Sequence, residues 1–299
     1  MTTSSAGVLI EARGLTKHYD GFSLEGVDLA VGEGEVVGLV GQNGAGKSTT
    51  IKALLGLIGV DGGEGFVLGT PSEELARPAG AATKELVGVV FDTVSLPGHL
   101  RVSDVGRIYS CAYASWDADG FSRLTRELGL AAEKAVKDLS RGMGMKLSLA
   151  CALSHGPQVL ILDEATAGLD PMARDEALER LRDFVAEPGH AILMSSHITS
   201  DLERIADRIV CMDAGRIVFD LPREAITDEA GIARCRAADL ERVTASGVVP
   251  ELRYLRHDYG VDVLVPDRFA FAESFPDIPC DRMTIDDYMA LTLKGGVWQ

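Results

Sequence analysis

The stretch from Val36 to Thr50, VVGLVGQNGAGKSTT, constrains the fold most, because an apolar β-branched run leads directly into a glycine-rich segment. Residues 41–48 fit the spacing G-x-x-x-x-G-K-[ST], which is typical of a phosphate-binding P-loop. Glycines let successive backbone N–H groups point at phosphate oxygens, and the following helix presents its positive N-terminal end. A glycine-rich turn that matches by chance is the alternative. The strand pattern before the loop and the helical pattern IKALLGLI after it favour the P-loop.

The P-loop predicts which residues contact a nucleotide. Lys47 is expected to reach the β- and γ-phosphates, and the Ser48 hydroxyl is expected to be a ligand of Mg²⁺. The predicted nucleotide-contacting residues of this stretch are Gly41, Asn43, Gly44, Ala45, Gly46, Lys47, Ser48 and Thr49.

The charge of the chain bounds its partners. Its 299 residues include 29 basic and 45 acidic side chains, for a net charge of −16. Such a balance argues against a protein that coats a polyphosphate backbone, so no nucleic acid partner is expected. A single nucleotide is a different case, because loop amides and Lys47 can hold it locally.

The cysteines and the apolar runs indicate a cytoplasmic protein. Five cysteines are scattered without C-x-x-C spacing, which is typical of reduced thiols rather than of a disulfide or metal framework: Cys111, Cys151, Cys211, Cys235 and Cys280. The first residues, MTTSSAGVLIEARG, lack the pattern of a secretory signal. No apolar run approaches the roughly 18 residues that span a bilayer. If the protein acts at a membrane, another chain must cross it.

Acidic side chains follow one predicted strand. The apolar run VLIL, residues 159–162, ends in Asp163 and Glu164, and carboxylates at the end of a buried strand are costly unless they have a function. Asp163 is placed to hold Mg²⁺ through water, and Glu164 to polarise an attacking water as general base. His197 follows another apolar strand, residues 191–196. A lone histidine there is often structural, but ligands bind at the carboxyl edge of parallel strands.

Two further residues have alternative interpretations. Tyr19 is predicted on a loop between antiparallel strands at 8–12 and 22–30, where it can stack on a purine or be a half-buried core residue. The residues alone leave both open. Ser140 is predicted to cap a helix that runs over residues 144–153. The other expected elements are helices at 48–58, 102–130 with a break at 115–120, and 171–185, and strands at 65–69, 86–91, 208–212 and 216–219.

In this order the motifs resemble the nucleotide-binding subunits of ABC transporters, over about residues 8–222. GQNGAGKST resembles Walker A, LSRGM the LSGGQ signature, VLILDE Walker B, GLD the D-loop, and His197 the switch histidine. The resemblance implies that Glu164, His197 and Lys47 are catalytic, that Tyr19 stacks on adenine, and that Mg²⁺ and ATP are the cofactors. It also implies a dimer, of identical or different chains, that sandwiches two ATP molecules. The residues of the signature and D-loop are Ser140, Arg141, Gly142, Met143 and Asp170.

Three motifs depart from the family pattern, at four positions. Asp92 stands where the Q-loop glutamine is expected, so its contact with magnesium and with the membrane partner is in question. Arg141 and Met143 alter the signature, and Ala165 replaces a usual proline. The segments FDTVSLPGHL, SWDADGFSRL and LSRGMGMKLSLACALSHGP resemble ABC-2 type exporter ATPases, in particular a subgroup associated with GntR-family regulators. The tail RMTIDDYMALTLKGG resembles the same subgroup.

The last part of the chain, residues 223–299, predicts a small α+β domain. Strands are expected at 231–236, 248–256 and 260–265, and helices at 237–245, 267–275 and 284–293. This order is compatible with a ferredoxin-like arrangement. No catalytic constellation is visible there, and dimer contact, regulation and simple stabilisation remain open as roles.

The predicted fold is therefore α/β: a P-loop NTPase of the ABC cassette type over residues 1–222, with a mixed RecA-like sheet, an antiparallel β part and a helical subdomain at about 93–156. The predicted function is ATP hydrolysis that powers a separate ABC-2 type transmembrane permease, on the cytoplasmic face of the membrane. The alternatives are a soluble ABC-type regulatory ATPase and a sensor with little hydrolysis. A translation or chromosome factor needs a second cassette or a long coiled coil, and the sequence shows neither.

Overall fold

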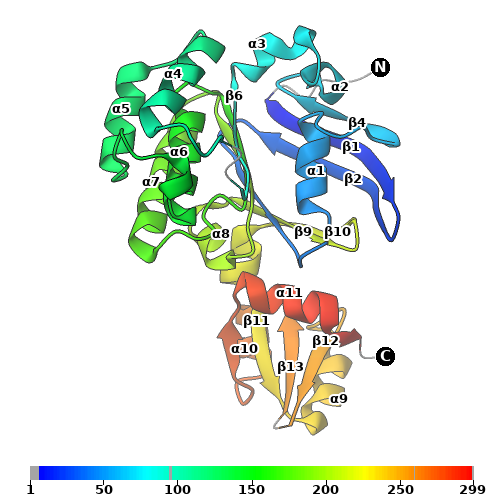
Figure 1. Cartoon of the computed structure of the whole chain (residues 1–299). Coiled ribbons are helices and arrows are strands. Elements are labelled where there is room, and N and C mark those ends of the chain that lie inside the picture. The colour runs from blue at the N-terminus through cyan, green and yellow to red at the C-terminus, as the bar shows by residue number, and fades with distance from the viewer. Residues whose placement is uncertain (1–6, 94–95, 259, 298–299) are drawn as a thin grey trace.

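The computed structural model describes residues 7–93, 96–258 and 260–297, so the first six residues and part of FDTVSLPGHL lie outside the described residues. Three sheets organise the chain (Figure 1). The first is antiparallel with the order β2-β1-β4-β5, formed by β1 (Val8–Tyr19), β2 (Phe22–Gly32), β4 (Gly62–Val67) and β5 (Thr70–Pro71). The expected antiparallel pair is confirmed, but Tyr19 ends β1 instead of lying on a loop.

The second sheet has the order β10-β9-β3-β8-β7-β6. Its strands are β3 (Val36–Val40), β6 (Val87–Val90), β7 (Val159–Asp163), β8 (Ala191–Ser195), β9 (Arg208–Asp213) and β10 (Arg216–Pro222). All but β10 pair in parallel. Every residue of β3, β7 and β8 is buried, as continuous apolar runs in a parallel sheet require. Their carboxyl ends consequently meet at one edge.

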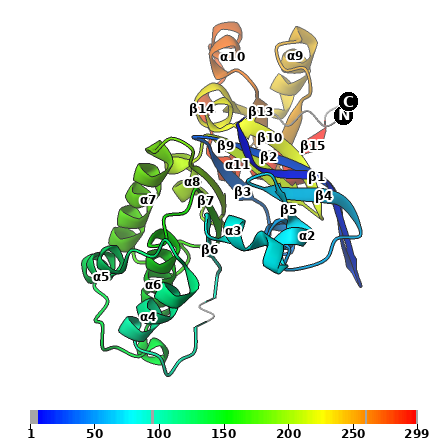
Figure 2. The ribbon, with the colours of Figure 1, turned by 90° about the horizontal axis from the view of Figure 1, so that it is seen from above.

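Helices cover this sheet and form a lobe beside it (Figure 2). The lobe is built from α4, α5 and α6, which share an apolar core that includes Val105, Phe121 and Leu147. The helical elements of this part are α1 (Lys47–Leu54), α2 (Ser72–Leu75), η1 (Pro78–Gly80), α3 (Ala81–Lys84), α4 (Val102–Ala112), α5 (Ala118–Glu127), η2 (Val136–Asp138), α6 (Arg141–Leu153), α7 (Pro171–Ala186) and α8 (Thr199–Ile205).

Helix α1 is shorter than the sequence pattern predicts, ending at Leu54 and not near Ile58. The Ser72 hydroxyl donates a hydrogen bond of 2.7 Å to the carbonyl of Leu54 and so satisfies a group at the helix end. Gly56 then adopts φ +66°, and a Cβ there would clash with the carbonyl oxygen of Ser72. The helix therefore ends where the α2 turn packs against it.

The third sheet is antiparallel, with the order β14-β11-β13-β12-β15. Its elements are β11 (Gly231–Cys235), α9 (Ala237–Ser246), β12 (Arg253–His257), β13 (Gly260–Val265), α10 (Arg268–Ser274), β14 (Cys280–Arg282), α11 (Ile285–Lys294) and β15 (Gly296–Val297). The succession β-α-β-β-α-β of the first six elements is that of a ferredoxin-like unit.

Two details of this unit differ from expectation. Strand β12 begins at Arg253 and not at Val248, because α9 ends on Gly247 at φ +71° and Pro250 has no N–H for a ladder. The strands β14 and β15 are three and two residues long, too short to show a period-2 pattern. Helices α9 and α10 cover one face of the sheet, and α11 covers the other (Figure 1).

Helix α11 also packs on the first part of the chain. Ile285 is fully buried in one core with Leu202 and Ile205 of α8. The Glu203 carboxylate accepts a 2.8 Å hydrogen bond from the backbone N–H of Ile285, the first residue of α11. Tyr288 meets Phe219 of β10 edge to face, with ring centroids 5.0 Å apart. The helix thus belongs to two hydrophobic cores at once.

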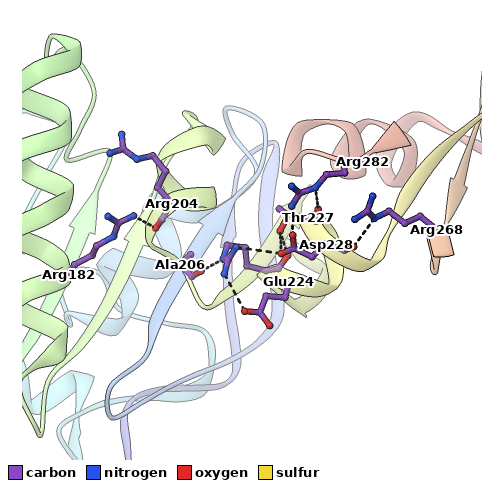
Figure 3. A network of polar contacts seen from close by, with 9 residues as sticks. Arg182, Arg204, Ala206, Glu224, Thr227, Asp228, Arg268 and Arg282 are labelled. Carbon is purple, nitrogen blue, oxygen red and sulfur yellow. Dashed lines mark hydrogen bonds and ion pairs between the residues drawn. The ribbon is translucent and has the colours of Figure 1, made fainter. Parts of the chain in front are cut away.

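Arginines surround the connecting segment η3 (Ala225–Glu229), as Figure 3 shows. The Asp228 carboxylate forms ion pairs with Arg282 and Arg223. The backbone carbonyl of Asp228 accepts a hydrogen bond of 2.9 Å from Arg268 Nε. Arg223 Nε in turn donates to the carbonyl of Ala206, at the end of α8. Because these side chains are partly exposed, the ion pairs contribute little to stability. Their main effect is to orient η3 between the two parts of the chain.

Replacing Ile285 with alanine is expected to lower the free energy of unfolding by about 2–4 kcal/mol, because it opens a cavity between the two cores. Leu57→Ala removes the same number of atoms from a side chain that is 59% exposed, and should change stability by about 0.5 kcal/mol or less. Urea titration followed by circular dichroism measures both. Equal effects in the two variants would show that α11 is not packed as described.

Candidate functional site

The P-loop lies between β3 and α1, at the carboxyl edge of the parallel sheet. Gly41 adopts φ +147°, and a Cβ there would press against the carbonyl oxygen of Met212. Gly46, which caps α1, adopts φ +113° and is closely surrounded by Leu24, Met212 and Phe22. A residue with a Cβ would be strained and crowded at these two positions. The spacing of the two glycines therefore has a physical cause.

Lys47 is nearly buried, with 6% of its surface exposed. Its ammonium group donates hydrogen bonds to the carbonyls of Gly41 (2.7 Å) and Gln42 (3.3 Å), which hold it inside the loop. The positive charge therefore lies at the start of α1, where the backbone amides of the loop converge. A site for anionic phosphates requires this arrangement.

A cavity of about 480 Å³ opens in front of this loop. Its volume is in the range of pockets that hold nucleotide-sized ligands. It brings together residues from six separate segments: Phe22, Asn43, Gly44, Ala45, Gly46, Lys47, Ser48, Thr49, Asp92, Arg141, Glu164, Ala167 and His197. Most of the predicted nucleotide-contacting residues thus line one cavity, together with both predicted catalytic partners of the lysine.

Glu164 and His197 form a pair on the wall of this cavity. The ring nitrogen Nδ1 of His197 is in close hydrogen-bond contact with Oε2 of Glu164, and the backbone N–H of His197 donates to the same oxygen at 3.2 Å. Glu164 has φ +57°, which is uncommon for a residue with a side chain and places its carboxylate against the cavity. A carboxylate held in this way at a cavity can accept a proton from water.

Asp163 is buried, with 2% of its surface exposed. The Ser195 hydroxyl donates a hydrogen bond of 2.6 Å to its Oδ1. A hydroxyl and one carboxylate, Ser48 and Asp163, are an appropriate protein contribution to Mg²⁺, which keeps waters and takes its other ligands from phosphates. Within residues 7–93, 96–258 and 260–297, no group of three or more histidine, cysteine, aspartate or glutamate side chains could hold a metal.

The signature residues lie at the start of α6. The Ser140 hydroxyl accepts a hydrogen bond of 3.2 Å from the N–H of Met143, so the predicted N-cap is confirmed, although α6 begins at Arg141 and not at Gly144. A Cβ on Gly142 would lie 2.6 Å from the carbonyl oxygen of Gly168, so α6 starts directly against the predicted D-loop. Only Arg141 of the four signature residues lines the cavity.

Asp170 caps the next helix. Its carboxylate accepts a hydrogen bond of 3.0 Å from the N–H of Ala173 in α7. This bond is the main reason why the pKa of Asp170 is held below its ordinary value. The residue therefore carries a negative charge at neutral pH.

The hairpin between β1 and β2 carries two aromatic residues near the cavity, Tyr19 and Phe22. Tyr19 is 46% exposed and does not line the cavity, whereas Phe22, across the turn, does. The two ring centroids are 6.4 Å apart. The aromatic pair flanking Asp20-Gly21 was the available signal for Phe22, and Tyr19 remains a predicted purine contact.

Comparison with known proteins gives a consistent result. The ABC transporter family profile matches residues 24–167. The Nod factor export ATP-binding protein I of Rhizobium meliloti (strain 1021) is 38% identical over 232 residues, which cover 74% of this chain and 67% of that protein. This chain belongs to the family of ABC transporter ATP-binding proteins. The cassette is also 35% identical to a probable multidrug ABC transporter ATP-binding protein, YbhF of Escherichia coli (strain K12), over 74% of this chain and 39% of that protein.

Solved structures show the same cassette fold. An ATP-binding subunit of an ABC transporter superposes with a TM-score of 0.66 at 30% identity, over 73% of this chain and 91% of that one. A dimeric ATP-binding cassette with ADP and Pi bound, in a post-hydrolysis state, gives a TM-score of 0.65 at 20% identity, over 72% of this chain and 99% of that one. The predicted ABC cassette fold is confirmed. In the part of this chain that the structure describes, no helix is long and apolar enough to cross a membrane.

The P-loop glycines allow a matched stability test on the cassette without nucleotide. Gly44 has φ +84° but open space around it, so Gly44→Ala should cost about 1 kcal/mol through backbone strain alone. Gly41→Ala adds the collision with Met212 and should cost about 3 kcal/mol. Thermal unfolding compares the two variants, and equal losses would contradict the loop geometry.

Proposed function

We propose that this chain binds ATP and Mg²⁺ and hydrolyses ATP to power a separately encoded ABC-2 type transmembrane permease, as an exporter subunit. Its relatives are named for Nod factor export and multidrug transport, which supports an export role. The sequence resemblance supports the ABC-2 subgroup associated with GntR-family regulators. In this proposal the chain works on the cytoplasmic face of the membrane, through its partner.

The observation that carries the proposal is the Glu164–His197 pair, which lines the same cavity as Asp92 and the P-loop. The loop amides and Lys47 bind and orient the phosphates. Glu164 accepts a proton from the water that attacks the terminal phosphate, while His197 fixes the carboxylate and contacts that phosphate. Ser48 and Asp163 would hold Mg²⁺, which neutralises charge on the β- and γ-phosphates when it is bound.

We further propose that two cassettes act together. Ser140 and Gly142 do not line the cavity of their own chain, although Gly142 lies against the D-loop. This placement supports a role for the signature residues Ser140, Gly142 and Met143 at the ATP of a second copy. Asp170 would meet the same dimer surface. Residues 1–222 would be the catalytic domain, and residues 223–299 an accessory domain.

A second candidate function is a nucleotide sensor with little hydrolysis. It is favoured by one observation: Asp92 and Arg141, two of the positions that depart from the family pattern, both line the cavity. A carboxylate at the Q-loop position changes the charge next to the phosphates. ATPase rates with and without the membrane partner separate the two functions, because a rate near zero in both conditions favours the sensor.

Glu164→Gln should retain ATP binding but lower kcat about 10²- to 10⁴-fold, because the amide cannot accept the proton of water. Lys47→Ala should instead lose ATP binding, since the phosphate charge is no longer balanced. Equilibrium binding of a fluorescent ATP analogue and steady-state phosphate release measure the two effects. Full turnover in the Glu164→Gln variant would refute the assigned role.

The tagged cassette should co-purify from detergent extracts with a multi-span membrane protein of the ABC-2 type. Its ATPase rate should rise when that protein is added back in vesicles. Recovery from the soluble fraction alone, with the same ATPase rate at every level of permease, would favour the soluble regulatory ATPase.

A further inference from the structure

Ser195 is the last residue of β8, the strand that lies between β3 and β7 in the sheet. In the parallel register it stands opposite Asp163 of β7 and Leu39 of β3. It is completely buried. A polar side chain in this position, inside an apolar sheet, must find hydrogen-bond partners within the protein.

Ser195 finds these partners in the two acidic residues at the end of β7, Asp163 and Glu164. Its hydroxyl donates to Asp163 Oδ1 at 2.6 Å, and its oxygen accepts from the backbone N–H of Glu164 at 3.2 Å. The Ser195 carbonyl accepts from the same N–H at 3.1 Å. A hydroxyl has one proton, and here that proton is committed to Asp163, so the direction of the bond is determined.

The two contacts meet two separate requirements of the site. Asp163 is 2% exposed, and among the described residues the Ser195 hydroxyl is the side chain that hydrogen-bonds its carboxylate. A buried carboxylate without such a donor is costly and free to rotate. Glu164 has the strained φ of +57°, and strained backbone persists only where its surroundings hold it.

We propose that Ser195 is a positioning residue for ATP hydrolysis, which aims Asp163 at the metal and holds the backbone of Glu164 so that its carboxylate faces the attacking water. This inference rests on the proposed function and deepens it. Ser195 is completely buried and does not line the cavity. It acts through the two carboxylates, as outer residues of metal sites commonly do.

The neighbouring Ser196 provides a matched control. It is almost as deeply buried, with 1% of its surface exposed, but its hydroxyl bonds with the backbone of Ile198, accepting from the N–H at 2.9 Å. It contacts neither carboxylate. The Ser196→Ala change therefore removes a hydroxyl from the same strand end without touching the proposed function of Ser195.

The decisive readout is the Mg²⁺ dependence of nucleotide binding, measured with a fluorescent ATP analogue in chains that also carry Glu164→Gln, so that hydrolysis does not interfere. Ser195→Ala should raise the Mg²⁺ concentration at half-maximal binding about tenfold. Binding in EDTA should be unchanged, since it depends on the P-loop. With Glu164 intact, Ser195→Ala should lower kcat about tenfold or more with little change in KM. Ser196→Ala should alter none of these values.

Two further variants keep the proposal testable if Ser195→Ala does not fold. Ser195→Cys keeps the shape of the side chain but has only a weak donor, so it should raise the Mg²⁺ concentration at half-maximal binding as Ser195→Ala does. Ser195→Thr keeps the hydroxyl, so its Mg²⁺ dependence should be close to that of the unchanged chain. Folded Ser195→Ala or Ser195→Cys with unaltered Mg²⁺ dependence and kcat would overturn the inference. If the unchanged chain binds ATP with Mg²⁺ but does not hydrolyse it, the proposed function fails while the Mg²⁺ titration still decides the role of Ser195.

Discussion

The site depends on the parallel pairing of β3, β8 and β7. These three strands come from distant parts of the chain, yet their register places the P-loop, the end of β8 and the acidic pair at one edge. A slip of one residue between β7 and β8 would turn Asp163 away from Ser195 and send Glu164 to the opposite face. Complete burial of the strands makes such a slip costly, so hydrophobic packing in the sheet positions the polar chemistry at its edge.

Much of this arrangement could be predicted from the residues. The P-loop spacing, the apolar run before Asp163 and the strand before His197 are local patterns with a physical cause, and each strand lies where its pattern indicates. Ser140 was predictable as a cap for the same reason, because a serine before a helix satisfies its first N–H groups. The β-α-β-β-α succession after residue 223 was also predictable, whereas β14, which completes the ferredoxin-like unit, is too short to show a pattern.

The remainder depends on contacts between segments that no local pattern reports. Phe22 faces the cavity because of the hairpin geometry that it shares with Tyr19, and two aromatics so close in sequence cannot be told apart by composition. Ser195 looks like any polar residue at a strand end until the register places it beside Asp163. Helix α1 ends early because Ser72, from another element, bonds its last turn.

The packing of α11 on α8 links the position of the last part of the chain to that of α8. Helix α8 begins two residues after His197, and its Glu203 holds the first amide of α11. Figure 1 shows α11 next to the first part of the chain, with α9 and α10 farther from it. With α11 packed in both cores, the ferredoxin-like unit is attached to α8, the helix that follows the histidine. Even a slight tilt of α8 would sweep the outer helices through a larger arc.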